Sequence, residues 1–162
     1  MRSTGYLCAL LLIVTTDAAL AEPPSFDPAT FFTGRTHGKG CLKVLLSRCR
    51  PITVASSGSV ASDGTLIVDQ DVTEGAKPPR HRQWSLKQTA PNRYTGILSD
   101  ALGPVDAIVS GNVMTLSFTM KRGLHATQTL TLAPDGTRVD NAMKIRKMGM
   151  VVATLNEVIE KE

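Results

Sequence analysis

Residues 26–40, Phe-Asp-Pro-Ala-Thr-Phe-Phe-Thr-Gly-Arg-Thr-His-Gly-Lys-Gly, decide how the rest of the chain can fold. Phe31 and Phe32 precede glycines at positions 34, 38 and 40 in an otherwise extended run. A strand with so many glycines must bend sharply or let another segment approach its backbone, as the first strand of a small closed barrel must do. Just before it, Asp27 and Pro28 predict a single helical turn capped by Asp27.

Short β-strands separated by turns follow to the C-terminus. The clearest is residues 113–121, where apolar and small polar residues alternate strictly, the signature of a half-buried antiparallel strand. Residues 150–159 fit a closing strand or a short helix, and their β-branched valines favour the strand. The other strands are expected over residues 35–44, 50–60, 65–72, 80–89, 93–99, 105–110, 124–132 and 138–147.

Nine or ten short strands with tight turns predict an all-β fold, a single antiparallel up-and-down meander. Such a meander either closes into a barrel or splits into two packed sheets. We favour the barrel because closure removes the strand edges that an exported β-protein must otherwise protect.

The N-terminus predicts export. A charged start, an apolar run over residues 6–14 and the small-residue site ending at Ala21 are typical of a secretory signal peptide. We expect residues 1–21 to be removed, one domain over residues 22–162, and a periplasmic or secreted location. An uncleaved anchor and a lipoprotein are the alternatives. Cys8 argues against lipidation, because Leu7 precedes it where a small residue is needed.

Charge and cysteines limit the partners. The formal net charge of +4 suits weak attraction to anionic surfaces, so peripheral contact with a membrane stays open. The basic residues are scattered, and the sequence therefore does not indicate a nucleic-acid partner.

Cys41 and Cys49 favour a disulfide in an exported chain. A metal site would need two more soft ligands, and His37 is the only near candidate, so we expect none.

No pattern for catalysis is present. The chain lacks a Gly-x-Ser-x-Gly turn, a phosphate loop and a dinucleotide glycine pattern, so we expect no enzyme, no catalytic residue and no cofactor. His37, His81 and His125 fall on different strands. A barrel can bring them together as ligands, but the alternation within the strands favours three exposed histidines.

Polar residues at core-facing positions are the candidate ligand-binding residues. By strand parity Arg82 shares an inward face with Trp84, and a buried polar group needs a partner. We expect Arg82 to pair with Asp69, Asp71 or a ligand head group, or to be reached by water at the barrel mouth. The candidate set is Gln70, Arg82, Trp84, Gln128 and Asn141.

The order of several short motifs resembles the bacterial family called domain of unknown function 3833. The motifs are Phe26-Asp-Pro-x-x-Phe-Phe-x-Gly-Arg-Thr-x-Gly-x-Gly40, Asp63-Gly-Thr-Leu66, Trp84-x-Leu86, Tyr94-x-Gly96, Gly111-Asn112, Asn141-x-Met143 and Gly149. The resemblance covers residues 26–162. It implies a lipocalin-like barrel that is exported, often lipid-anchored and without an established activity. The pair Cys41 and Cys49 departs from the family pattern, as does the lack of a suitable anchor cysteine.

Together these observations predict an exported barrel that binds a small apolar or amphipathic molecule, such as a lipid or fatty acid. The alternative is a structural or envelope-interaction protein whose barrel is filled by side chains. A continuous internal cavity favours binding, and a solid core favours the structural role.

Overall fold

The computed structural model describes residues 24–162, so the predicted signal peptide lies outside the described residues. The described part holds one short α-helix, ten strands and a single 3₁₀ turn, η1, at Lys121–Gly123. Their bounds are α1 Pro28–Phe32, β1 Gly34–Val44, β2 Arg50–Val60, β3 Leu66–Glu74, β4 Arg80–Ala90, β5 Arg93–Leu98, β6 Val105–Ser110, β7 Val113–Met120, β8 Leu124–Leu132, β9 Arg138–Lys147 and β10 Met150–Lys161.

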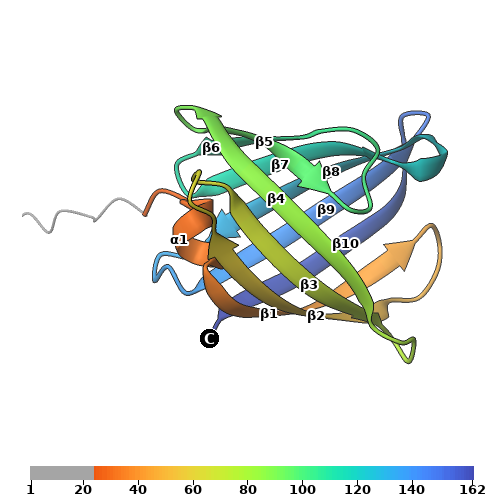
Figure 1. Ribbon diagram of the computed structural model, residues 1–162. Helices are drawn as coiled ribbons and strands as arrows, with labels where there is room; N and C mark the ends of the chain where they lie inside the picture. Colours follow the sequence, from red (N-terminus) through yellow and green to blue (C-terminus); the bar gives the residue numbers. More distant parts are fainter. Residues whose placement is uncertain (1–23) are drawn as a thin grey trace, which may run out of the picture.

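The ten strands form a closed antiparallel barrel (Figure 1). Each strand pairs with its neighbours in the sequence, and β1 completes the circle by pairing with β10. Gly38 of β1 lies between Val54 of β2 and Ile159 of β10. The predicted all-β meander is therefore confirmed, and the last segment is a strand. None of the described helices is long and apolar enough to cross a membrane.

The glycines of β1 let β10 approach closely. A Cβ atom added to Gly40 would lie 2.4 Å from the carbonyl oxygen of Asn156, which is far inside contact distance. Only a glycine fits there without displacing the backbone of β10. The glycine-rich first strand is thus needed for closure of the barrel, as the sequence indicated.

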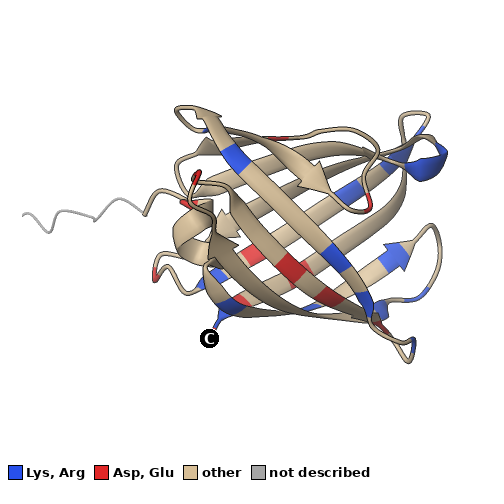
Figure 2. Cartoon of the chain, in the orientation of Figure 1, with Lys and Arg blue, Asp and Glu red and all other residues tan. Residues whose placement is uncertain are grey.

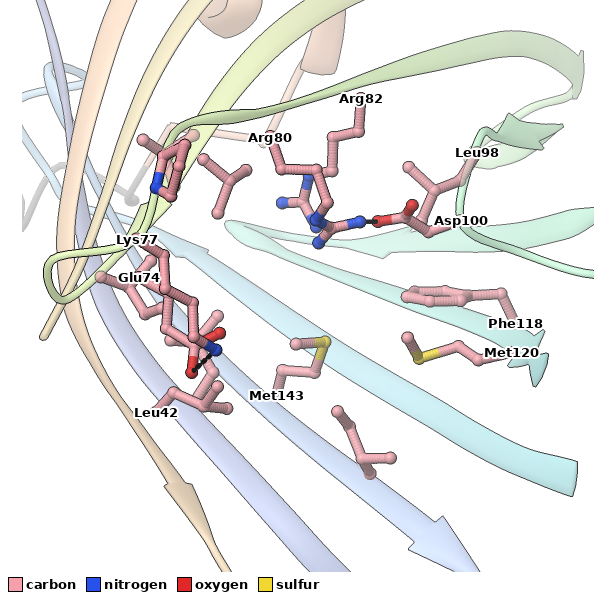
Figure 3. Close-up of a pocket in the computed structure, with 16 residues that line it drawn as sticks. Leu42, Glu74, Lys77, Arg80, Arg82, Leu98, Asp100, Phe118, Met120 and Met143 are labelled. Carbon is pink, nitrogen blue, oxygen red and sulfur yellow. Dashed lines mark hydrogen bonds and ion pairs between the residues drawn. The ribbon is translucent and has the colours of Figure 1, made fainter. Parts of the chain in front are cut away.

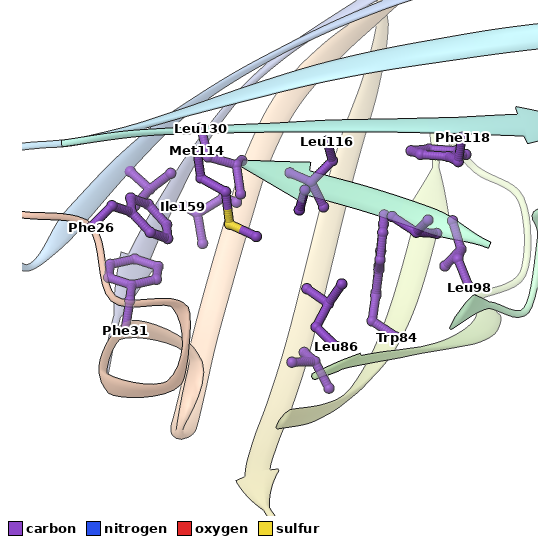
Figure 4. Packing of buried hydrophobic residues seen from close by; sticks show 14 of the residues in the cluster. Phe26, Phe31, Trp84, Leu86, Leu98, Met114, Leu116, Phe118, Leu130 and Ile159 are labelled. Atoms are coloured by element: carbon purple, nitrogen blue, oxygen red, sulfur yellow. The ribbon is translucent and has the colours of Figure 1, made fainter. Parts of the chain in front are cut away.

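Helix α1 covers one end of the barrel (Figures 1 and 4). The Asp27 carboxylate caps it by accepting a hydrogen bond from the Ala29 amide at 3.0 Å, and Pro28 occupies the first turn. Phe26 and Phe31 are buried in the core cluster. The aromatic side chains around this turn close that end of the barrel.

The core follows the period-two pattern of the strands. On β7, Met114, Leu116 and Phe118 point inward and are buried. Phe118 meets Trp84 of β4 edge to face, with ring centroids 5.6 Å apart and ring planes at 87° (Figure 4). Burying each large apolar side chain stabilises the fold by about 1.5–3 kcal/mol.

Candidate functional site

The half of the barrel away from α1 is hollow. A cavity of about 470 Å³ lies there and opens at the barrel end opposite the helix (Figure 3). Its walls are mainly apolar, with charged side chains around the opening. The apolar lining residues are Leu42, Ile52, Val54, Val72, Pro78, Leu98, Phe118, Met120, Met143, Ile145 and Leu155.

Charged residues at the opening are paired with one another. Glu74 accepts from Arg50 at 2.5 Å and from Lys77 at 3.1 Å. Arg80 pairs with Asp100 on the opposite side of the opening (Figure 3). These pairs are exposed or partly exposed, so each contributes little to stability. The cavity entrance is polar, and its paired side chains are three cations and two anions.

Arg82 lies at the inner end of the cavity and is half-buried. Its Nε donates to the Gln70 side-chain oxygen at 2.8 Å, and its guanidinium lies 5.7 Å from the centre of the Trp84 ring. Burial lowers the Arg82 pKa, and the attraction of Glu157 and Asp100 partly offsets this effect. Within residues 24–162 no carboxylate lies within ion-pair distance of Arg82.

The predicted pairing of Arg82 with Asp69 or Asp71 is wrong. Both carboxylates lie on the outer face of β3, where His81 approaches Asp69 at 3.4 Å and Asp71 at 3.2 Å. The reason is strand parity, because Gln70 is the residue of that segment that points inward. Of the partners expected for Arg82, neither aspartate reaches it, and the Gln70 side-chain oxygen accepts from it instead.

The Gln70 side chain makes hydrogen bonds with residues of two neighbouring strands, β4 and β2. The same side-chain oxygen that accepts from Arg82 also accepts from the Trp84 indole nitrogen at 2.9 Å. The Gln70 amide nitrogen donates to Ser56 on β2 at 3.1 Å. These three hydrogen bonds fix the orientation of the Gln70 amide and hold Arg82 and Trp84 together.

A second polar group lies deeper, beside a small chamber of about 40 Å³. Asn141 donates to the Glu157 carboxylate at 2.8 Å, and both side chains are buried. Burial raises the Glu157 pKa, while the Asn141 hydrogen bond and the charge of Arg82 oppose the increase. The Asn141 oxygen has no hydrogen-bond partner within the described residues. The chamber has room for water but not for a larger ligand.

The structure brings all five candidate residues to one place: Gln70, Arg82, Trp84, Gln128 and Asn141 line the same inner chamber. Sequence reasoning missed Glu157, which lies there too. Its signal was the inward series Ala153, Leu155, Glu157 and Ile159 on β10, which can be read only once that segment is taken as a strand.

The three histidines do not converge. His37 lies near Glu160 at 3.1 Å, His81 near the two aspartates of β3, and His125 near the Thr119 hydroxyl at 3.2 Å. Each is on the outer wall of a different strand, as the alternation of the sequence indicated.

A ten-stranded closed barrel, covered at one end and hollow at the other, defines the class of the protein as a lipocalin-like β-barrel. The chain belongs to the family described as "Protein of unknown function (DUF3833)", whose profile matches residues 11–161. The family resemblance predicted from the motifs is therefore confirmed. None of the curated proteins matches the chain.

Three solved structures share the fold. The S-type phycobiliprotein lyase CPES from Guillardia theta aligns with a TM-score of 0.60 and 6% identity, over 80% of this chain and 88% of that one. Rv2717c from M. tuberculosis gives 0.62 and 14%, over 84% and 98%. A DUF3598-family protein of unknown function from Nostoc punctiforme gives 0.60 and 12%, over 88% and 51%. At these identities the similarity shows the fold alone.

Proposed function

We propose that the barrel binds a small amphipathic molecule with an anionic head group, such as a fatty acid, and is not an enzyme. The observation that carries this proposal is an apolar cavity of about 470 Å³ with the Arg82 guanidinium at its inner end. Pockets that bind small molecules span about 300–1,000 Å³ and combine apolar walls with a few polar groups.

Arg82 is the residue best suited to hold the head group. Its Nε is engaged by Gln70, whereas its terminal nitrogens make no hydrogen bond within residues 24–162. A guanidinium presents two parallel donors to a carboxylate, and such charge-assisted pairs are strong. A ligand carboxylate would also offset the free energy of burying the Arg82 charge away from water.

The cavity wall suits a flexible apolar chain. Met120 and Met143 face the cavity together with Phe118 (Figure 3). Methionine side chains are unbranched and polarisable, so they adapt to ligands of irregular shape. The similarity to a phycobiliprotein lyase supports a barrel that accommodates another molecule, although at 6% identity no residue role is transferred.

The alternative, a barrel filled by side chains, describes only the half beside α1. There Phe31, Met114 and Leu130 occupy the interior. The other half is open, and this favours binding over a purely structural role.

Export belongs to the same proposal, because a disulfide between Cys41 and Cys49 persists best in an oxidising compartment.

A fluorescence titration tests the proposal. Trp84 is the only tryptophan and lies beside Arg82, so decanoate in the cavity should shift or quench its emission. Arg82→Leu should weaken decanoate binding about tenfold or more, since a hydrogen bond to a charged group contributes roughly 1.5–3 kcal/mol. The matched control is Arg93→Leu, an exposed arginine at the start of β5, which should bind like the parent.

Two results would replace this proposal with the filled-barrel role. One is an unchanged Trp84 emission in the parent together with no retained small molecule in native mass spectrometry of protein purified from its own host. The other is equal binding by the parent and Arg82→Leu.

A further inference from the structure

Large apolar side chains project from two hairpins beside the open end of the barrel. Leu45 and Leu46 lie in the β1–β2 hairpin, with exposures of 71% for Leu45 and complete exposure for Leu46. Met148 and Met150 lie in the β9–β10 hairpin and are 88% and 69% exposed. The hairpins are neighbours, since the Leu45 amide donates to the Val152 carbonyl at 2.8 Å. Side chains of this size gathered in water mark an interaction surface.

The backbone holds these tips in an unusual conformation. Leu45 and Met148 have φ angles of 49° and 48°, in the left-handed region that bulky residues rarely adopt. A disulfide joins Cys41 to Cys49 across the first hairpin, with the two Cα atoms 5.5 Å apart. Unfavourable conformations that the surrounding structure maintains often accompany function. The apolar tips are therefore presented by fixed backbone.

Basic residues surround the apolar tips. The three neighbouring segments 43–49, 121–123 and 146–151 contain no aspartate or glutamate. In Figure 2 lysine and arginine gather at this end of the barrel, opposite α1. Within residues 24–162 none of these basic side chains is paired with a carboxylate. They are Lys43, Arg48, Lys121, Arg122, Arg146 and Lys147.

We propose that this surface, the apolar tips with their six basic neighbours, docks the barrel onto an anionic lipid bilayer. A bilayer fits better than a folded partner because the apolar chains stand on protruding tips, where they can enter the acyl region. The basic residues then lie at the level of anionic head groups. The docked barrel would direct its open end toward the membrane. This proposal does not depend on which molecule, if any, the cavity holds.

Vesicle co-sedimentation of the protein is the direct test. Vesicles of equal parts phosphatidylglycerol and phosphatidylcholine should sediment the parent protein, and vesicles of phosphatidylcholine alone should do so much less. Added salt should release it, because screening weakens the attraction of exposed charges. Replacing Arg122 with serine should weaken binding about fivefold, the effect of roughly one basic contact. Leu46→Ser should weaken binding about tenfold.

Two control variants carry the same changes at the other end of the barrel. Val60→Ser removes an exposed apolar side chain at the end of β2, and Arg93→Ser removes an exposed charge at the start of β5. Both should bind vesicles like the parent. Thermal unfolding by circular dichroism verifies that all four variants are folded, which is expected because each replaced side chain is exposed.

The proposal is overturned if the parent does not sediment with anionic vesicles, or if the tip variants bind as tightly as the controls. It is also overturned if light scattering shows a dimer that Leu46→Ser dissociates, because the tips then join two copies of the chain. Decanoate binding by Trp84 fluorescence is measured on the same variants. Loss of vesicle binding with intact decanoate binding separates this proposal from the cavity function.

Discussion

The buried carboxylate of Glu157 lies directly against the backbone of Gly38, so that a Cβ atom added to this glycine would be 2.0 Å from Oε1. Gly38 is on β1 and Glu157 is on β10, two strands that meet only when the barrel closes. The glycine thus provides the space in which the buried carboxylate accepts its hydrogen bond from Asn141.

Gly38→Ala should therefore destabilise the protein by about 1–3 kcal/mol, the usual effect of an extra methyl group in a filled interior. Urea unfolding followed by circular dichroism measures the change. The double variant Gly38→Ala with Glu157→Ala removes the clash and should be more stable than the sum of the single effects. Strict additivity of the two changes would show that the contact between these residues is unimportant.

Glu157→Gln should change how stability depends on pH. Because burial raises the Glu157 pKa above 4.5, the folded protein binds a proton more readily than the unfolded chain. The folded state is therefore stabilised as the pH falls from neutral toward 4.5, and this gain is lost as the pH rises through the folded-state pKa. The variant lacks this titration, so the parent should gain stability relative to it on acidification.

Thermal unfolding of both proteins across this pH range gives the comparison. Glutamine at position 157 is uncharged, as a protonated Glu157 is, and its side-chain oxygen can still accept the hydrogen bond from Asn141. The two proteins should thus approach one another in stability at the acidic end. Parallel profiles over the whole range would contradict the raised pKa.

Gln70→Leu should destabilise the fold by about 1–3 kcal/mol, since it leaves the Trp84 and Arg82 donors without their shared acceptor. The matched control is Gln128→Leu. Gln128 is also 8% exposed, but its side chain makes no hydrogen bond within the described residues. Urea unfolding should show a smaller effect for the control. Equal effects would mean that the Gln70 hydrogen bonds add nothing measurable.

The disulfide should stabilise the protein by roughly 2–3 kcal/mol, because it restricts a short loop of the unfolded chain. Unfolding of the parent with and without reductant, and of the double variant Cys41→Ser with Cys49→Ser, measures this contribution. The intact mass should rise by two hydrogen atoms, about 2 Da, when the reductant supplies two electrons and two protons and converts the disulfide into two thiols. Two freely alkylated thiols in periplasmically expressed, non-reduced protein would refute the bond.

The period-two alternation of the strands predicted most of the core and of the inward-facing site residues. Alternation on β7 located the core, and parity on β4 correctly placed Arg82 beside Trp84. The same parity that points Gln70 inward also points Asp69 and Asp71 outward, so two of the alternative partners expected for Arg82 conflict with it. Glu157 was missed for a different reason: the sequence favours a strand over residues 150–159 but also fits a short helix, and the inward face of a segment is defined only once its period is known.

The sequence did not predict which part of the barrel interior is empty. A barrel is hollow when the inward side chains of its ten strands and α1 together do not fill the interior. That total volume depends on residues far apart in the sequence, so no local sequence pattern predicts it. Residues such as Met120 and Met143 can fill a core or line a cavity. The structure shows that Phe26 and Phe31 fill the end of the barrel beside α1. Met120 and Met143 lie in the other half, where they line the cavity.

The covered end gives the interior the topology of a blind tube. Any molecule that enters must leave by the same opening in reverse order, so the group that arrives first departs last. In the proposed complex Arg82 would hold the polar head group at the inner end of the cavity, so the release of that group would limit the exchange of the whole molecule. The rate of ligand exchange would then depend on the contacts of the head group at the inner end of the cavity, and not on the surface that the opening faces.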